Sequence, residues 1–108
     1  MRILIVDDSK VARMSLKRAL PDDYKNGEID IAKNGEEAVN KYKENKYDIV
    51  FMDLTMPIKD GYQATKEITD FDKDAFVVVV TADIQKSGFE KVIESGASRI
   101  VPKPATTE

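Results

Sequence analysis

The chain has 108 residues, 42% of them hydrophobic and 34% charged, which is the size and composition of one globular domain. It contains no cysteine and no histidine, so disulfide bonds, thiolate chemistry and imidazole chemistry are excluded. Its net charge of −3, without any run of basic residues, argues against a nucleic-acid surface, and we expect no direct nucleic-acid partner.

Short apolar segments alternate along the chain with longer amphipathic segments. The apolar segments predict β-strands at Ile3–Val6, Ile29–Ala32, Ile49–Met52, Phe76–Val80 and Ile100–Val101. The intervening segments predict helices at Ser9–Leu20, Gly35–Asn45, Gly61–Phe71 and Ile84–Ser95. Because the strands are rich in Val and Ile without alternation, we expect a parallel sheet buried on both faces. The predicted fold class is therefore a single doubly wound α/β domain over residues 1–108.

Residues typical of helix ends support these boundaries. Ser9 precedes the first expected helix, and Asn34, followed three residues later by Glu37, forms a capping-box pattern at the second. Gly96 follows the last expected helix, where a left-handed backbone conformation is common. These capping residues thus predict the same helix boundaries as the periodic pattern of apolar residues.

The longest apolar run, residues 76–80, is far too short to cross a bilayer. The first expected strand begins directly after Met1, with no leader pattern before it. We therefore expect a cytoplasmic protein with no membrane partner.

Charged and polar side chains follow four of the expected strands. Asp7 and Asp8 follow the first strand, Asp53 the third, Thr81 the fourth and Lys103 the fifth. Taken singly, each has an ordinary explanation as a turn, a strand-end residue or a solvated charge. In a doubly wound sheet, however, ligands bind beyond the carboxyl ends of the strands, so their convergence on that edge indicates a functional site.

The two adjacent aspartates indicate a cation. Two like charges about 4 Å apart repel by roughly 4 kcal/mol at an effective dielectric constant near 20, and a bound cation would remove that repulsion. Without histidine or cysteine, the ligands must be oxygen atoms, which suit Mg²⁺, Ca²⁺ or Mn²⁺.

The sequence resembles the receiver domain of two-component response regulators, and is similar to single-domain chemotaxis-type regulators. Four motifs that span almost the whole chain support the resemblance: LIVDDS at 4–9, DIVFMDLTMPIKDGYQA at 48–64, VVVVTA at 77–82 and VPKP at 101–104. The resemblance implies a flavodoxin-like five-stranded sheet with the strand order 2-1-3-4-5.

The resemblance also implies a role for each site residue. Asp53 would accept a phosphoryl group from a partner histidine kinase or phosphotransfer protein, and the product would change binding to a downstream protein target. Asp7, Asp8, Asp53 and the main-chain carbonyl of Thr55 would hold Mg²⁺, with Mn²⁺ as a second candidate. Residues Thr81 and Lys103 would bind the phosphoryl oxygens. The chain would then be a signalling domain and not an enzyme.

Two alternatives stay open at this point. A metal-dependent phosphatase could use Asp53 as its nucleophile, but the second acid that such enzymes place two residues later is Thr55 here. A pseudo-receiver could act only as a binding module, although all five expected site residues are present. No glycine-rich nucleotide-binding loop supports a third class.

Two features depart from the family pattern. Ile100 occupies a position where many receivers carry an aromatic residue that takes part in switching. The sequence given stops at KPATTE, so we expect the usual fifth helix to be missing at the C-terminus. Because a doubly wound sheet needs both faces covered, we expect a homodimer that covers the open face.

Overall fold

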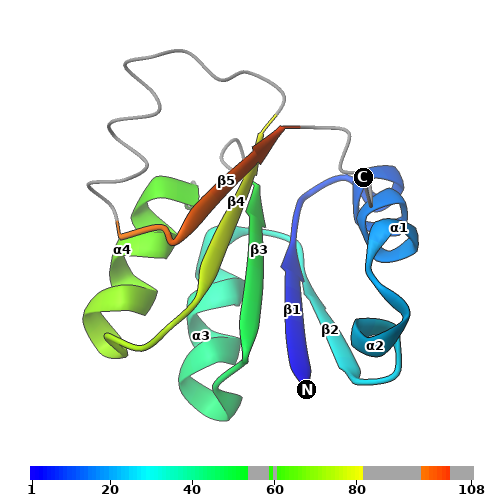
Figure 1. Cartoon of the computed structure of the whole chain (residues 1–108). Coiled ribbons are helices and arrows are strands. Elements are labelled where there is room, and N and C mark those ends of the chain that lie inside the picture. The colour runs from blue at the N-terminus through cyan, green and yellow to red at the C-terminus, as the bar shows by residue number, and fades with distance from the viewer. Residues whose placement is uncertain (54–58, 60, 82–95, 103–108) are drawn as a thin grey trace.

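The computed structural model describes residues 1–53, 59, 61–81 and 96–102. The described strands are β1 (Arg2–Val6), β2 (Glu28–Ala32), β3 (Ile49–Asp53), β4 (Val77–Thr81) and β5 (Arg99–Pro102). The described helices are α1 (Lys10–Ala19), α2 (Asp22–Lys25), α3 (Gly35–Asn45) and α4 (Gly61–Phe71). All strand pairs are parallel and the order is β2-β1-β3-β4-β5, which confirms the predicted flavodoxin-like sheet (Figure 1).

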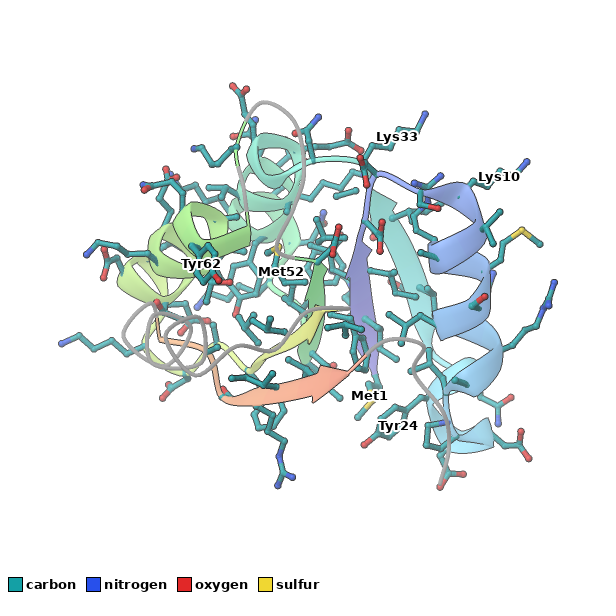
Figure 2. All side chains as sticks on the ribbon, turned by 90° about the horizontal axis from the view of Figure 1, so that it is seen from above. Met1, Lys10, Tyr24, Lys33, Met52 and Tyr62 are labelled. Carbon is teal, nitrogen blue, oxygen red and sulfur yellow. The ribbon has the colours of Figure 1, made fainter. Side chains whose placement is uncertain are left out.

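Helices cover both faces of this sheet. Seen from above, α1 lies on one side and α3 and α4 lie on the other (Figure 2). The larger apolar cluster lies between the sheet and helices α3 and α4, and its Leu4, Val50 and Met52 are fully buried. A smaller cluster on the α1 side is built on Ile3 and Ile5. Alternate residues of one strand therefore supply two cores, as a doubly wound sheet requires.

The predicted burial on both faces holds for β1 and β4, is partial for β3, where Ile49 and Phe51 are half-buried, and is wrong for the edge strand β2. Residues 3–6 of β1 are at most 1% exposed, whereas Ile31 on β2 is 46% exposed. In the described part of the chain, β2 has a neighbouring strand on one side only, so its outer edge and part of one face meet solvent.

Helix boundaries follow the capping signals. The Asn34 side chain accepts a hydrogen bond from the Glu37 amide at 2.8 Å, and α3 begins at the predicted residue. Ser9 caps α1 by accepting from the Ala12 amide at 3.2 Å. Gly96 has φ of +99°, which confirms the predicted left-handed position.

The short helix α2 was not predicted. It is one turn of four residues, which is too short to show an apolar period. Its local signals are Pro21 at the N-cap position and two acids, Asp22 and Asp23, in the first turn, where the helix dipole favours negative charge.

Some predictions fall on residues outside the described ones. They include the helix expected at 84–95 and everything after Pro102. The missing fifth helix and the homodimer inferred from it therefore stay predictions. Among the described helices, none has the length and apolar character to cross a bilayer.

Candidate metal centre

Three aspartates gather at the carboxyl edge of the sheet because β1 and β3 are neighbours. Val6 pairs with Met52 in the β1–β3 ladder, so the residues that follow them emerge side by side. One carboxylate oxygen from each of Asp7, Asp8 and Asp53 lies within 4.8 Å of the other two. The structure thus brings together the three acids predicted to share a cation.

The cluster is open to solvent on one side. Asp7 and Asp53 are buried, at 5% and 8% exposure, whereas Asp8 is exposed. A ligand can therefore approach from the Asp8 side, while the other two carboxylates stand in a partly desolvated setting that strengthens their interaction with charge.

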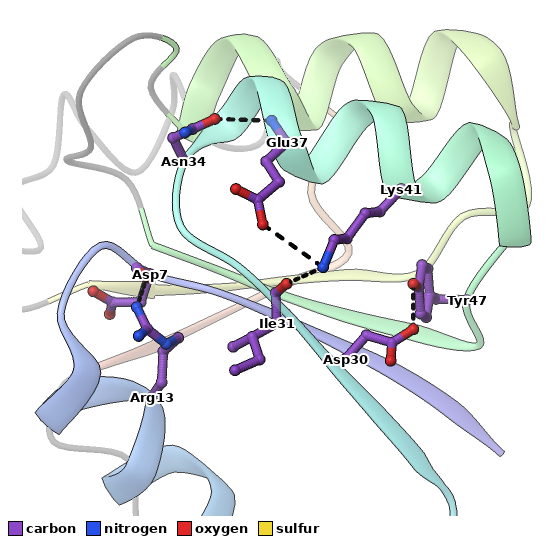
Figure 3. A network of polar contacts seen from close by, with 8 residues as sticks. All are labelled: Asp7, Arg13, Asp30, Ile31, Asn34, Glu37, Lys41 and Tyr47. Atoms are coloured by element: carbon purple, nitrogen blue, oxygen red, sulfur yellow. Dashed lines mark hydrogen bonds and ion pairs between the residues drawn. The ribbon is translucent and has the colours of Figure 1, made fainter.

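Local contacts fix the position of Asp7. Its amide donates to the Ala32 carbonyl at 3.1 Å, and one of its carboxylate oxygens accepts from the Ser9 amide at 2.9 Å. The Arg13 guanidinium donates to the Asp7 main-chain carbonyl at 2.7 Å (Figure 3). Contacts to β2, to the following loop and to α1 therefore hold the residue at the strand end.

Sequence reasoning missed Arg13. The contact runs from the first turn of a helix back to a carbonyl six residues earlier, and no periodic pattern marks such a pair. The available signal was an arginine near the start of the helix that directly follows the two aspartates.

The donor set fits a hard divalent cation. All three side chains offer carboxylate oxygens, which are the ligands that Mg²⁺ prefers, and the open side leaves room for the waters that Mg²⁺ retains. At an effective dielectric constant near 20, each like-charged pair at this separation repels by roughly 3 kcal/mol. A cation at the centre would turn that repulsion into attraction.

The remaining predicted site residues are only partly described. Thr81 is the last residue of β4 and follows Val80, which pairs with Asp53, so its backbone stands at the same edge. Its side chain lies outside the described part, as do Thr55 and Lys103. Ile100 is half-buried and packs against the larger apolar cluster.

Comparisons with known proteins agree with this arrangement. The family model for the response regulator receiver domain matches residues 3–108. The chemotaxis protein CheY of Halobacterium salinarum is 40% identical over 103 residues, which cover 95% of this chain and 84% of that protein. CheY of Thermotoga maritima is 45% identical over 105 residues, covering 95% and 85%.

Solved structures show the same fold. A chain of the CheX–CheY–BeF₃–Mg²⁺ complex from Borrelia burgdorferi matches with a TM-score of 0.87 and 36% identity, covering 96% of this chain and 78% of that one. The response regulator domain of Thermotoga maritima CheB matches with a TM-score of 0.81 and 31% identity, covering 100% and 81%.

Proposed function

The chain belongs to the response regulator receiver domain family, and on that premise we propose that it carries a signal as a phosphoryl group on Asp53. The proposal depends chiefly on one observation, the meeting of Asp7, Asp8 and Asp53 within 4.8 Å at the ligand edge of the sheet. The phosphodonor would be a phosphohistidine on a partner kinase or phosphotransfer protein, as in the family; this chain contains no histidine and cannot be its own phosphohistidine donor.

The acidic cluster would hold the metal. Asp7, Asp8 and Asp53, together with the main-chain carbonyl of Thr55, would bind Mg²⁺, and Mn²⁺ suits the same oxygen donors. When bound, the cation supplies positive charge that offsets the charge of the phosphoryl oxygens and of the attacking carboxylate.

In the transfer step, a carboxylate oxygen of Asp53 forms a bond to phosphorus while the bond from phosphorus to the donor imidazole nitrogen breaks. The imidazole leaves with the electron pair of the broken bond. Such a transfer asks the protein mainly for positioning and charge stabilisation. We assign the binding of the phosphoryl oxygens to Thr81 and Lys103.

The phosphorylated chain would then bind a downstream protein differently from the unmodified chain. The Borrelia burgdorferi structure pairs CheY with a second protein, CheX, in the presence of BeF₃ and Mg²⁺, which supports a protein target for this chain as well. We infer a signalling role and no turnover of a separate substrate.

The test is phosphorylation by a small donor. Incubation with acetyl phosphate and Mg²⁺ should add one phosphoryl group, seen by intact-mass analysis, and omission of Mg²⁺ should abolish the reaction. Asp53→Asn should stay unmodified, while Asp70→Asn, at an exposed aspartate on α4, should react like the parent chain. The same adduct on Asp53→Asn would refute the assignment.

A further inference from the structure

Helix α1 concentrates positive charge in an acidic protein. The whole chain has 17 Lys and Arg against 20 Asp and Glu, yet α1 (KVARMSLKRA) contains four basic residues and no acid. The rest of the chain is left with 13 basic residues against the same 20 acids. Helix α1 is therefore positively charged, although the chain as a whole is negatively charged.

The ion pairs of the described residues include pairs within the other two long helices and none on α1. On α3, Lys41 pairs with Glu37 at 3.6 Å, and α4 contains a corresponding pair at 3.8 Å between Lys66 and Asp70. Among the described residues, neither Lys10 nor Lys17 makes an ion pair. Within the described part of the chain, no carboxylate therefore neutralises these two lysines.

A groove of about 220 Å³ runs between α1 and strand β2. Its floor consists of Ile5, Ile29 and Ile31, and on the helix side Met14 lies among the basic side chains. Met14 and Ile31 are 45% and 46% exposed, although both are large hydrophobic residues. The surface therefore combines an apolar floor with a cationic wall.

The spacing of the wall residues selects an elongated ligand. Lys10, Arg13 and Lys17 all line the groove and recur every three or four residues, so they form one ridge. From position 10 to 17 the ridge is about 10 Å long at 1.5 Å per residue. A small anion could bridge at most two neighbouring cations of this ridge, whereas an acidic helix presents carboxylates at the same spacing along its whole length.

Strand addition fits this surface less well. In the parallel sheet, the Ala32 carbonyl accepts from Asp7 on β1, so the main-chain groups of Ile31 point to the outer edge. The Lys41 ammonium already donates to the Ile31 carbonyl at 2.5 Å, as Figure 3 shows. An added strand would have to displace this lysine, which Glu37 also holds.

We propose that the α1–β2 groove is a docking site for an amphipathic helix of a partner protein. The apolar face of that helix lies on the isoleucine floor, and acidic residues on its flank meet Lys10 and Lys17. Flexible Met14 adapts to the side chains that enter. The site does not depend on the phosphoryl chemistry at Asp53.

The experiment is a chemical-shift titration of the isotope-labelled full chain. The probe is a capped helical peptide with leucines on one face and glutamates on both flanks, and the matched peptide has lysine in place of each glutamate. The acidic peptide should shift the amides of Ile29, Ile31 and Met14 in a saturable way. The basic peptide should not.

Charge-reversed variants test the wall. Lys10→Glu combined with Lys17→Glu should weaken binding of the acidic peptide by about tenfold, which is ~1.4 kcal/mol. Arg18→Glu is the matched control, because Arg18 lies on α1 but outside the groove lining, and it should bind nearly as the parent does. Each variant is first checked for an unchanged melting temperature.

Several outcomes would overturn the proposal. They are the absence of saturable shifts at the groove, equal weakening by Arg18→Glu, or equal binding of the basic peptide. Shifts at the groove that follow the protein concentration alone would instead assign it to a second copy. Shifts produced by phosphatidylglycerol vesicles but not by the peptide would assign it to a lipid surface. Asp53→Asn should bind the peptide like the parent, so this result stands apart from the test of phosphorylation.

Discussion

Arg13 connects helix α1 to the acidic cluster through a single main-chain contact. Its guanidinium donates to the carbonyl of Asp7 at 2.7 Å, while the Asp7 carboxylate lies in the cluster. Groups that hold a metal ligand in place commonly contribute tenfold or more to metal affinity. Because Arg13 contacts the main chain of Asp7 and not its carboxylate, its contribution to metal affinity should be near tenfold and not far above it.

We therefore expect Arg13→Ala to weaken Mg²⁺ binding by about tenfold or somewhat less. Magnetic resonance titration of the Asp7 and Ser9 amides with MgCl₂ measures the affinity. Arg18→Ala removes the same charge from the same helix without touching Asp7, and should bind Mg²⁺ like the parent. Equal affinities for the parent and Arg13→Ala would show that the contact does not position the cluster.

Among the individual residues, the three aspartates of the cluster could be predicted from the sequence, whereas Arg13, which holds Asp7, could not. Asp7, Asp8 and Asp53 could be placed because each follows a strand, and the carboxyl ends of parallel strands share one edge. Arg13 could not be placed, because its contact depends on the angle at which α1 leaves the sheet. That angle is a property of packing and is not encoded in any spacing of residue types.

Two buried tyrosines form hydrogen bonds to acids on other segments. Tyr42 lies on α3, and Tyr47 follows the C-terminal end of this helix. The Tyr42 hydroxyl donates to the Asp72 carboxylate at 2.8 Å, and the Tyr47 hydroxyl donates to the Asp30 carboxylate on β2 at 2.6 Å. Their rings lie 6.2 Å apart between centroids. Burial, followed by the hydrogen bond to Asp30, raises the pKa of Tyr47 from its ordinary value of 10.0 to about 12.

This pKa shift makes the fold sensitive to alkali. The folded state keeps the Tyr47 proton above pH 10.0, where the unfolded chain releases it, so the stabilisation is complete below that pH. It is lost as the pH rises from 10.0 towards about 12. The pKa of Tyr42 is raised in the same direction, first by burial and then by its bond to Asp72.

We predict that urea midpoints fall steeply above pH 10.0 and that Tyr47→Phe makes the fall shallower. At neutral pH this variant should lose about 1 kcal/mol with its hydrogen bond. Tyr24→Phe, at a half-buried tyrosine on α2, is the matched control. Its urea midpoint should fall with pH as steeply as that of the parent. A slope unchanged by Tyr47→Phe would contradict the assignment of the alkaline transition to this residue.

The elements were predicted best where a cap agreed with the apolar period. Helices α3 and α4 have the predicted boundaries, and α1 lacks one predicted residue at each end, because Ser9 and Leu20 are its caps. The strand order could be predicted only from the resemblance to receiver domains, since apolar runs do not specify which strands are neighbours. The exposure of β2 was missed because β2 was grouped with the Val- and Ile-rich strands, although its sequence EIDIA alternates acidic and apolar residues, as a half-exposed strand does.

Across the whole molecule, we predict that the three carboxylates of the acidic cluster oppose folding unless a cation is bound. Three carboxylates within 4.8 Å of one another repel in the folded chain and separate when it unfolds. Removing one charge should therefore stabilise the metal-free protein. A cation that binds only the folded state should stabilise it further, by about 2.7 kcal/mol at one hundred times its dissociation constant.

Thermal unfolding in EDTA and in excess MgCl₂ tests both consequences. For a domain of this size, ~1 kcal/mol corresponds to roughly 4–8 °C in melting temperature. In EDTA, Asp53→Asn should melt several degrees above the parent, because an amide of the same shape replaces one of three repelling charges. In MgCl₂ the melting temperature of the parent should rise the most, and that of Asp53→Asn should rise much less because this variant has lost one of the proposed ligands.

Asp70→Asn is the control. It removes one exposed negative charge outside the cluster, and its melting temperature should follow that of the parent in both conditions. If Asp53→Asn melts below the parent in EDTA, the three carboxylates are not a repelling cluster, and the structural reason for a cation at this edge fails with them.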